Sequence, residues 1–132
     1  MNSPTDATGA PRSQRGDARV LLTGAATMDA FTLIQRTLPP HHPGEPLHAH
    51  PEHSEGCYVL EGTVAVSWND RTVTLVAGTA ARIPAGARHT FWNPTALPAA
   101  VLLIYTPGTT AEAARALADG PPAQPPAYDD TS

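Results

Sequence analysis

The chain of 132 residues has the length of one domain, long enough to bury a core without disulfides. All eight basic residues are arginines, and twelve acidic residues give a formal net charge of -4, so the composition argues against a nucleic-acid partner. The start of the chain lacks the apolar segment of a signal peptide, and the longest apolar run, at 99–105, is too short to span a bilayer, so we expect a cytoplasmic protein without membrane contact.

The first part of the chain changes character after about 17 residues. Residues 1–17 are rich in Ser, Thr, Pro, Gly and charge without periodicity, so we expect a flexible N-terminal arm. Two runs rich in apolar and β-branched residues follow at 18–24 and 30–38, and the turn-forming sequence PPHHPG at 39–44 ends them. These runs predict the first strands of a domain that covers 18–119.

Short strands separated by turns are also predicted for the middle of the chain. Apolar residues alternate with small or polar ones on both sides of Asn69-Asp70, which is typical of a β-hairpin. The same pattern returns at 80–86, 89–94 and 99–105. Eight or more short strands, with 15 prolines and 10 glycines as punctuation, favour an antiparallel barrel or sandwich.

Helical signals are confined to the sequence at 109–120. Thr110 suits the N-cap position, the segment is rich in alanine, and Gly120 follows its last turn. We therefore predict one short C-terminal helix. After it, a proline-rich tail at 120–132 is expected to be disordered.

The stretch from His48 to Gly62 carries the candidate site. His48 and His50 are one residue apart, so on extended backbone both imidazoles point to the same side. If the chain bends after them and returns as a strand, Glu55 faces the pair, and His89 is available as a further ligand. Taken alone, two histidines at this spacing are more often surface or hydrogen-bonded residues than a metal site. The remaining spacing decides between the two interpretations.

Two sets of residues at characteristic spacings occur in this region. In the first, four residues separate His50 from Glu55, and six residues separate Glu55 from Gly62. The second set consists, in order, of Gly78, Pro84, Gly86, His89 and Asn93. At these spacings the residues resemble the two signature motifs of the cupin superfamily, closely over 44–93. The leading glycine of the first motif differs, because His42 stands at its usual position and Gly44 lies nearer to the histidines.

The resemblance implies an all-β, cupin-type antiparallel jelly-roll barrel with a metal ion inside. The ion would be held by the four motif side chains, His48, His50, Glu55 and His89. It would be one divalent transition metal ion, and the ligand types alone do not choose among Fe, Mn, Ni, Co, Cu and Zn. Four protein ligands leave two positions of an octahedral ion open for a small-molecule substrate or O₂. Gly62 and Gly86 are expected where positive φ or close backbone approach is needed.

The region 55–108 is similar to small single-domain cupins, or monocupins, of the quercetinase-like group. That similarity implies a metal-dependent, dioxygenase-like oxidoreductase acting on a small phenolic, enol or polyketide-like substrate. Glu55 would then be both a ligand and the general base. Two alternatives stay open: a metal-assisted cyclase or isomerase of natural-product biosynthesis, and a non-enzymatic cupin that binds a small ligand or a metal. Similar cupins are often homodimers, so a homodimer is expected.

Other residues with possible roles are undecided from the sequence. His53 stands in the bend after the ligand pair and is either a solvated loop residue or a proton carrier. Arg82 is either a surface charge or a substrate anchor. His41 and His42 lie in a proline-rich turn and are expected to be exposed. Cys57, the single cysteine, is interpreted as a small buried apolar residue in a reducing compartment.

Overall fold

The computed structural model describes residues 17–120. The expected N-terminal arm at 1–17 and tail at 120–132 lie outside this range except for Asp17 and Gly120, so both remain expectations. Asp17 is the first residue of the first strand, and Gly120 is the C-cap of the last helix.

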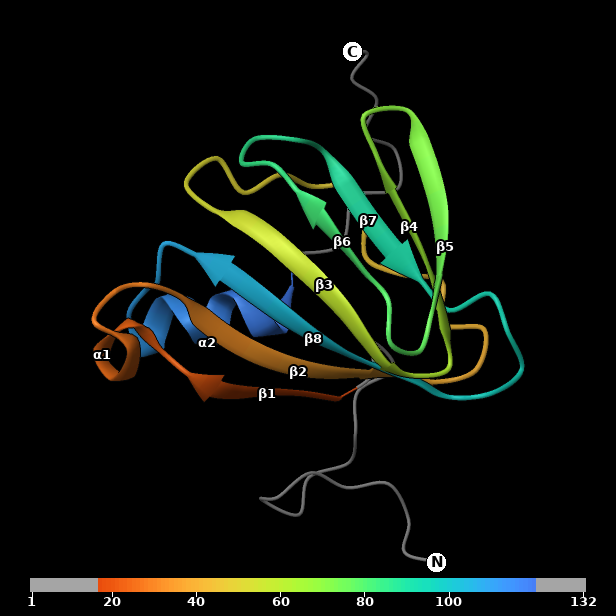
Figure 1. Cartoon of the computed structure of the whole chain (residues 1–132), viewed down its shortest axis with the longest axis horizontal. Helices are drawn as coiled ribbons and strands as arrows, with labels where there is room; N and C mark the ends of the chain where they lie inside the picture. The colour runs from red at the N-terminus through yellow and green to blue at the C-terminus, as the bar shows by residue number, and fades with distance from the viewer. Residues whose placement is uncertain (1–16, 121–132) are drawn as a thin grey trace, which may run out of the picture.

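Two antiparallel sheets form the described part of the chain (Figure 1). The eight strands are β1 Asp17–Leu22, β2 Thr32–Leu38, β3 Ser54–Glu61, β4 Thr63–Trp68, β5 Arg71–Val76, β6 Ala80–Ile83, β7 His89–Trp92 and β8 Ala99–Thr106. The larger sheet has the order β1-β2-β8-β3-β6 and the smaller one β5-β4-β7. This arrangement confirms the predicted all-β jelly-roll class.

The core lies between the two sheets because inward residues alternate with outward ones along each strand. In β2, every second residue from Thr32 to Leu38 is buried, and β8 shows the same alternation from Val101 to Tyr105. Side chains from the two sheets and α2 form one apolar cluster, which includes Ile34, Leu38, Cys57, Val59, Val64, Val66, Ile83, Phe91, Val101 and Leu103. The interpretation of Cys57 as a buried apolar residue is thus confirmed, with 1% of its surface exposed.

Tight turns join the strands where the sequence predicts them. Asn69 and Asp70 both have positive φ, 50° and 61°, as the two central residues of a type I′ hairpin require. Gly62 has φ 79°, and a Cβ there would lie 2.6 Å from the Pro98 carbonyl oxygen, so a side chain would force the backbone to move. Gly86 also has positive φ, 83°. The expectations for these positions are confirmed.

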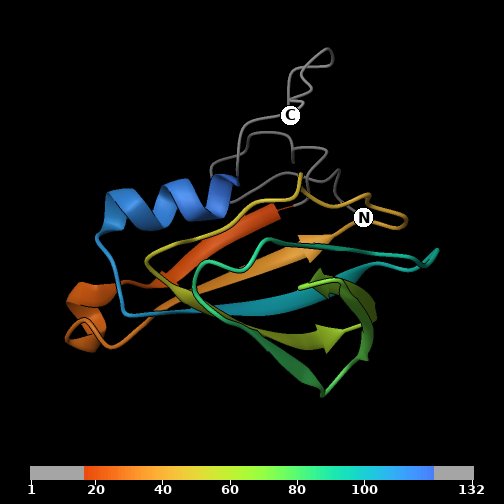
Figure 2. The same ribbon diagram turned by 90° about the horizontal axis from the view of Figure 1, so that it is seen from above.

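Two helices accompany the sheets, α1 Gly24–Thr27 and α2 Ala111–Asp119. The sequence predicts α2, whose first turn is capped by the Thr110 hydroxyl accepting from the Ala113 N–H at 3.1 Å. Its residues Ala114 and Ala118 are buried against β1 and β2, and Figure 2 shows α2 lying along that side of the larger sheet. The single turn α1 is too short to leave a periodic signal and was not predicted.

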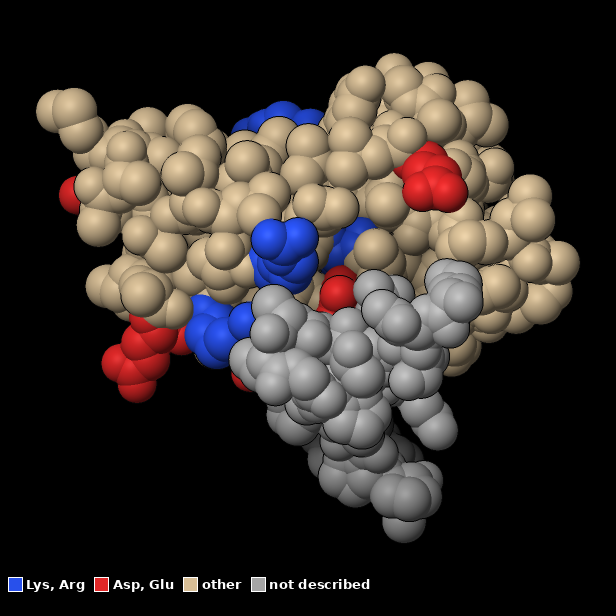
Figure 3. Space-filling model, turned by 90° about the horizontal axis from the view of Figure 1, so that it is seen from below, with Lys and Arg blue, Asp and Glu red and all other residues tan. Residues whose placement is uncertain are grey.

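One face of the molecule shows how charged side chains are distributed. On the face drawn in Figure 3, arginine side chains lie interspersed with acidic ones and do not form an unbroken basic patch. Within residues 17–120, neither helix has the length and apolar character that crossing a membrane requires.

Candidate metal centre

Backbone hydrogen bonds hold the loop between β2 and β3 against the start of β7. The His48 N–H donates to the His89 carbonyl at 3.1 Å, and the His89 N–H donates to the His48 carbonyl at 2.8 Å. Paired in this antiparallel way, the two residues place their side chains on the same side. The Gly86 N–H donates to the His50 carbonyl at 3.0 Å and fixes the loop two residues further along.

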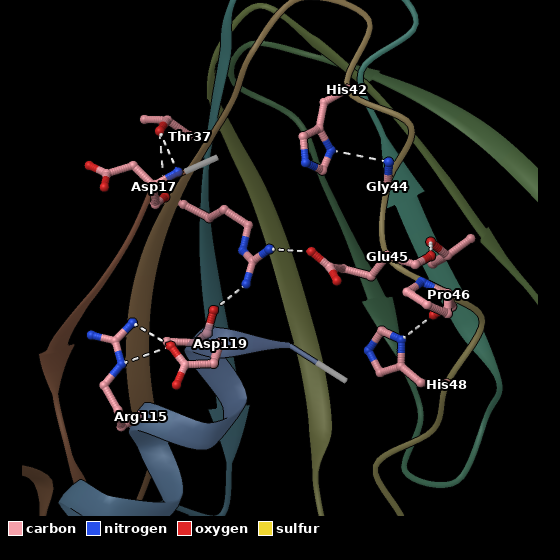
Figure 4. Close-up of polar contacts among 12 residues, drawn as sticks. Asp17, Thr37, His42, Gly44, Glu45, Pro46, His48, Arg115 and Asp119 are labelled. Atoms are coloured by element: carbon pink, nitrogen blue, oxygen red, sulfur yellow. Dashed lines mark hydrogen bonds and ion pairs between the residues drawn. The ribbon is translucent and has the colours of Figure 1, made fainter. Parts of the chain in front are cut away.

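Three imidazoles converge inside the barrel. Each of His48, His50 and His89 offers a ring nitrogen, and these nitrogens all lie within 4.8 Å of one another. In His48 and His89, Nδ1 lies 2.7 Å and 2.9 Å from the carbonyl oxygens of Pro46 and Ala87. A proton on Nδ1 donates to the carbonyl, so Nε2 is left with a free lone pair. Figure 4 shows the His48 ring beside Pro46.

The carboxylate of Glu55 lies next to two of these rings. Its Oε1 is 3.4 Å from His50 Nε2 and 3.1 Å from His89 Nε2, and only 1% of its side chain is exposed. These contacts are short enough for ion pairs but are not aligned as hydrogen bonds, so both oxygens and both Nε2 atoms are buried without a hydrogen-bond partner. Groups that converge in this way without bonding to one another suit a shared cation.

Electrostatics tie the carboxylate to the imidazoles. Burial raises the pKa of Glu55, but His50 and His89 outweigh this effect and hold it at about 2, so the group is ionised. Burial lowers the pKa of His89, but the neighbouring carboxylate and the Ala87 carbonyl together outweigh this effect, and the net shift is upward. Burial lowers the pKa of His48, which favours the neutral form that binds metals.

The residues present therefore fit a divalent transition metal ion. His48, His50 and His89 could bind such an ion through neutral Nε2 atoms, a donor type that suits Fe, Cu, Ni and Zn. Their Nδ1 partners orient two of the rings, as the outer hydrogen bonds of metal-binding histidines do. The structure thus brings together all four residues that the sequence singled out. That Glu55 is the fourth ligand stays a prediction.

Family membership follows from the sequence of the barrel. The model of the Cupin domain family matches residues 35–105, more than half of the chain. The chain is a member of the cupin family. This confirms the superfamily that the motifs indicated, whereas the quercetinase-like subgroup remains a prediction. No curated protein matches the sequence.

Solved structures resemble this cupin over most of its length. A protein from Thermus thermophilus is 27% identical, with a TM-score of 0.63 over 70% of this chain and 84% of that one. A predicted oxalate decarboxylase from Thermotoga maritima is 24% identical, with a TM-score of 0.62 over 67% and 76% of the two chains. A cupin-2 domain containing protein from Shewanella frigidimarina is 23% identical, with a TM-score of 0.56 over 70% and 81%. The last two likenesses show the fold alone.

Tyr105 is part of the cupin site but was not a candidate from the sequence. It lies directly opposite Glu55 in the pairing of β3 with β8, so both side chains face inward. Its ring is 5.5 Å from the His50 ring, and 3% of its surface is exposed. Burial, with a further contribution from the Glu55 charge, raises the pKa of Tyr105 well above 10, so its hydroxyl stays protonated. The alternation along 101–105 is the signal that could have identified it.

A cavity of about 340 Å³ opens beside the histidines. One side is the loop from His48 to His53, and the other is the face of α2 that includes Ala113 and Leu117. Because two ligand candidates line this cavity, it is the space in which a molecule could reach an ion held by them. The sequence predicted α2 but not that the helix would form a wall of the site.

An ion pair anchors both walls of this cavity. Arg36 Nη1 donates to Glu45 Oε2 at 2.9 Å, and Nη2 donates to the Ala118 carbonyl at the end of α2. Both charged residues are buried. Figure 4 shows that Glu45 lies in the same loop as His48, three residues before it. Arg36 thus links the loop that carries the first histidine to the helix across the cavity.

The turn before the site corrects one expectation. His42 was expected to be exposed, but only 4% of its surface is, because its Nδ1 accepts from the Gly44 N–H at 3.1 Å inside the turn. Gly44 has φ 89°, and a Cβ there would lie 2.3 Å from the Phe91 carbonyl oxygen. The close approach that needs a glycine therefore occurs at Gly44. His41 is exposed, as expected.

The two residues left undecided fall on opposite sides of the larger sheet. His53 is half-buried, lines the cavity, and its Nδ1 lies 3.1 Å from the Pro107 carbonyl oxygen. Arg82 is exposed on β6 and pairs with Gly56, whose neighbour Glu55 faces inward. Strand alternation directs Arg82 to the outer face, which supports its interpretation as a surface charge.

Proposed function

We propose that this cupin is a metal-dependent, dioxygenase-like oxidoreductase acting on a small phenolic or enolic substrate. The observation that carries the proposal is the convergence of three imidazole Nε2 atoms and a buried, ionised carboxylate on one point beside a cavity. His48, His50, His89 and Glu55 would hold the ion. Bound there, a divalent ion lowers the pKa of a hydroxyl that it polarises and brings the substrate and O₂ together.

Glu55 is the group suited to take up the substrate proton. It is ionised at neutral pH, and with the ion nearby an acidified phenol or enol can transfer its proton to the carboxylate. The electron pair of the broken O–H bond stays on the substrate oxygen and makes the ring or enol electron-rich. In a dioxygenase reaction both atoms of O₂ enter the product, so the substrate supplies all the electrons and no separate reductant is consumed.

Tyr105 is placed to orient the reacting oxygen. Its hydroxyl is protonated at all physiological pH values and lies on the same inward face as Glu55. A protonated hydroxyl beside a carboxylate provides one donor and one acceptor to a bound enol. The same pair supports a second candidate function, a metal-assisted cyclase or isomerase, because moving a proton within the substrate needs no O₂. A third candidate is a cupin that binds a small ligand or metal without turnover.

Oxygen uptake separates these functions. Protein reconstituted with Fe(II), Mn(II) or Ni(II) is mixed with a panel of catechols, flavonols and cyclic enols in an oxygen electrode cell, with His89→Ala as the control. The proposal predicts substrate-dependent uptake by the wild type alone, with one O₂ consumed per substrate converted. Conversion at an unchanged rate under argon would replace it by the cyclase or isomerase. Binding without conversion in either atmosphere would leave the non-enzymatic function.

We further propose that the protein is cytoplasmic and forms a homodimer through the outer face of the larger sheet. Tyr58 and Leu60 project from this face of β3 and are 38% and 43% exposed. Leu102 and Ile104 of the adjacent β8 are half-buried beside them, since outward residues of the two strands are paired. An apolar surface across two adjacent strands favours association. The single buried cysteine agrees with a reducing compartment.

A further inference from the structure

One stripe of α2 faces the cavity beside the metal centre. Ala113, Ala116, Leu117 and Gly120 line it, at the spacing that places residues on one side of a helix and its C-cap. The neighbouring positions Ala114 and Ala118 point into the core instead. The stripe is uncharged, and its two alanines present only a methyl group each. The helix therefore gives the cavity a flat, apolar wall opposite the histidines.

In the described part of the chain, no arginine lines the cavity to bind an acidic group at a distance from the metal centre. Among the described residues that line it, Glu52 is the only acidic one, none is an arginine, and Glu52 is exposed. Arg36, which donates to the end of α2, is buried and pairs with Glu45. Against the α2 wall, a carboxylate on the remote end of a ligand would lose its hydration without gaining a charged partner. The α2 wall therefore selects against anionic ligand bodies.

We propose that this α2 wall is the specificity-determining surface of the cavity, and that it receives the uncharged, apolar body of the substrate. The substrate would place its reacting oxygen at the histidine end and a compact aromatic or branched aliphatic group against Ala113 and Ala116. This inference rests on the proposed function, because it assumes that a ligand oxygen binds at the metal centre. The inference goes beyond the proposed function by naming the residues that set the size and charge of the substrate.

The dimensions of the cavity suit a small substrate. A volume of about 340 Å³ lies near the lower end of the roughly 300–1,000 Å³ that small-molecule sites occupy. Ala116 is exposed in the helix and is not part of the core cluster, so a larger side chain there extends into the cavity without displacing core residues. Substitution at this position should therefore reduce the space for the ligand body while leaving the histidines in place.

Three catechols with the same chelating head group test this proposal. Catechol, 4-tert-butylcatechol and 3,4-dihydroxybenzoate are titrated under argon into the Co(II)-loaded protein, with Co(II) absorption and calorimetry as readouts. We expect the tert-butyl compound to bind at least about tenfold more tightly than catechol, the low end for added methylene groups in an apolar pocket. The carboxylate should bring no gain in affinity. In Ala116→Phe the tert-butyl preference should fall to near parity, while catechol affinity changes by less than about threefold.

Controls separate loss of the wall from loss of the fold. Ala111→Phe makes the same change at an exposed position of α2 that does not line the cavity, and it should keep the wild-type preference. Ala116→Leu is the milder variant and should give an intermediate preference. Unchanged selectivity in folded Ala116→Phe and Ala116→Leu would overturn the inference and leave the proposed function intact. Failure of wild-type Co(II) protein to bind any of the catechols would overturn both.

Discussion

The pairing of Glu55 with the histidines makes Glu55→Gln informative even without a metal. The substitution keeps the shape of the side chain and removes its charge in a site where both carboxylate oxygens are buried. In the metal-free protein the carboxylate stabilises protonated His89, whose pKa is raised, and the histidines in turn stabilise the carboxylate. Removal of the charge should therefore destabilise the protein only where both partners are ionised.

The magnitude follows from the pKa of Glu55. Its fall from 4.5 to about 2 corresponds to roughly 3 kcal/mol of interaction favouring the carboxylate, at about 1.4 kcal/mol for each pKa unit. This stabilisation is present above pH 4.5 and is lost as the pH falls through about 2. The contribution of His89 is complete below pH 6.5 and is lost as the pH rises through its raised pKa. Both contributions are present together at about pH 5.5.

Urea unfolding of chelator-treated protein, followed by tryptophan fluorescence, measures this effect. At about pH 5.5 we expect Glu55→Gln to lower the free energy of unfolding by roughly 3 kcal/mol, out of the typical 5–15 kcal/mol. At a high pH, above the raised pKa of His89, the loss should shrink because the ring is then neutral. Glu61→Gln, at the exposed end of the same strand, is the matched control. An equal loss at both pH values would refute the assigned pairing.

Three further measurements test other parts of the structure. Below the raised pKa of His89, metal affinity should fall about tenfold for each unit by which the pH is lowered, because the ion must displace the proton of His89. A chelator competition assay that finds no pH dependence would contradict this. Gly44→Ala should lower the free energy of unfolding by roughly 1–3 kcal/mol in thermal denaturation, because its Cβ would meet Phe91. Gly78→Ala is also at positive φ but has open space around it, so it should lower the free energy of unfolding by less. Equal losses would exclude the clash. Leu60→Glu should convert the proposed dimer to a monomer in analytical ultracentrifugation. A wild-type protein that already sediments as a monomer would exclude the dimer.

The fold and the convergence of the histidines could be predicted because their signals are local. Alternation along β2 and β8, the turn at Asn69-Asp70 and the capped segment after Thr110 each fix one element from its own residues. The one-residue spacing of His48 and His50 is likewise a property of extended backbone. The position of His89 needed the family spacing, because His89 forms only an isolated bridge with His48, which lies in a loop far away in the sequence.

The surroundings of the site depend on contacts between distant segments and could not be predicted in the same way. Tyr105 reaches the site through its register with Glu55, which requires knowing that β3 and β8 are neighbours. Arg36 on a strand would ordinarily be assigned to the surface, but here Glu45 and the end of α2 satisfy it inside. The burial of His42 similarly depends on a turn whose shape the residue types alone do not specify.

The most direct test of the metal centre is the metal content of the protein itself. Wild-type protein purified without chelator, and again after reconstitution, is measured by inductively coupled plasma mass spectrometry beside His50→Ala, His89→Ala and the exposed control His41→Ala. The account predicts about one transition metal ion per chain in the wild type and in His41→Ala, with substantial loss in the two ligand variants. Full occupancy in folded His50→Ala and His89→Ala, or no binding by reconstituted wild type, would contradict it.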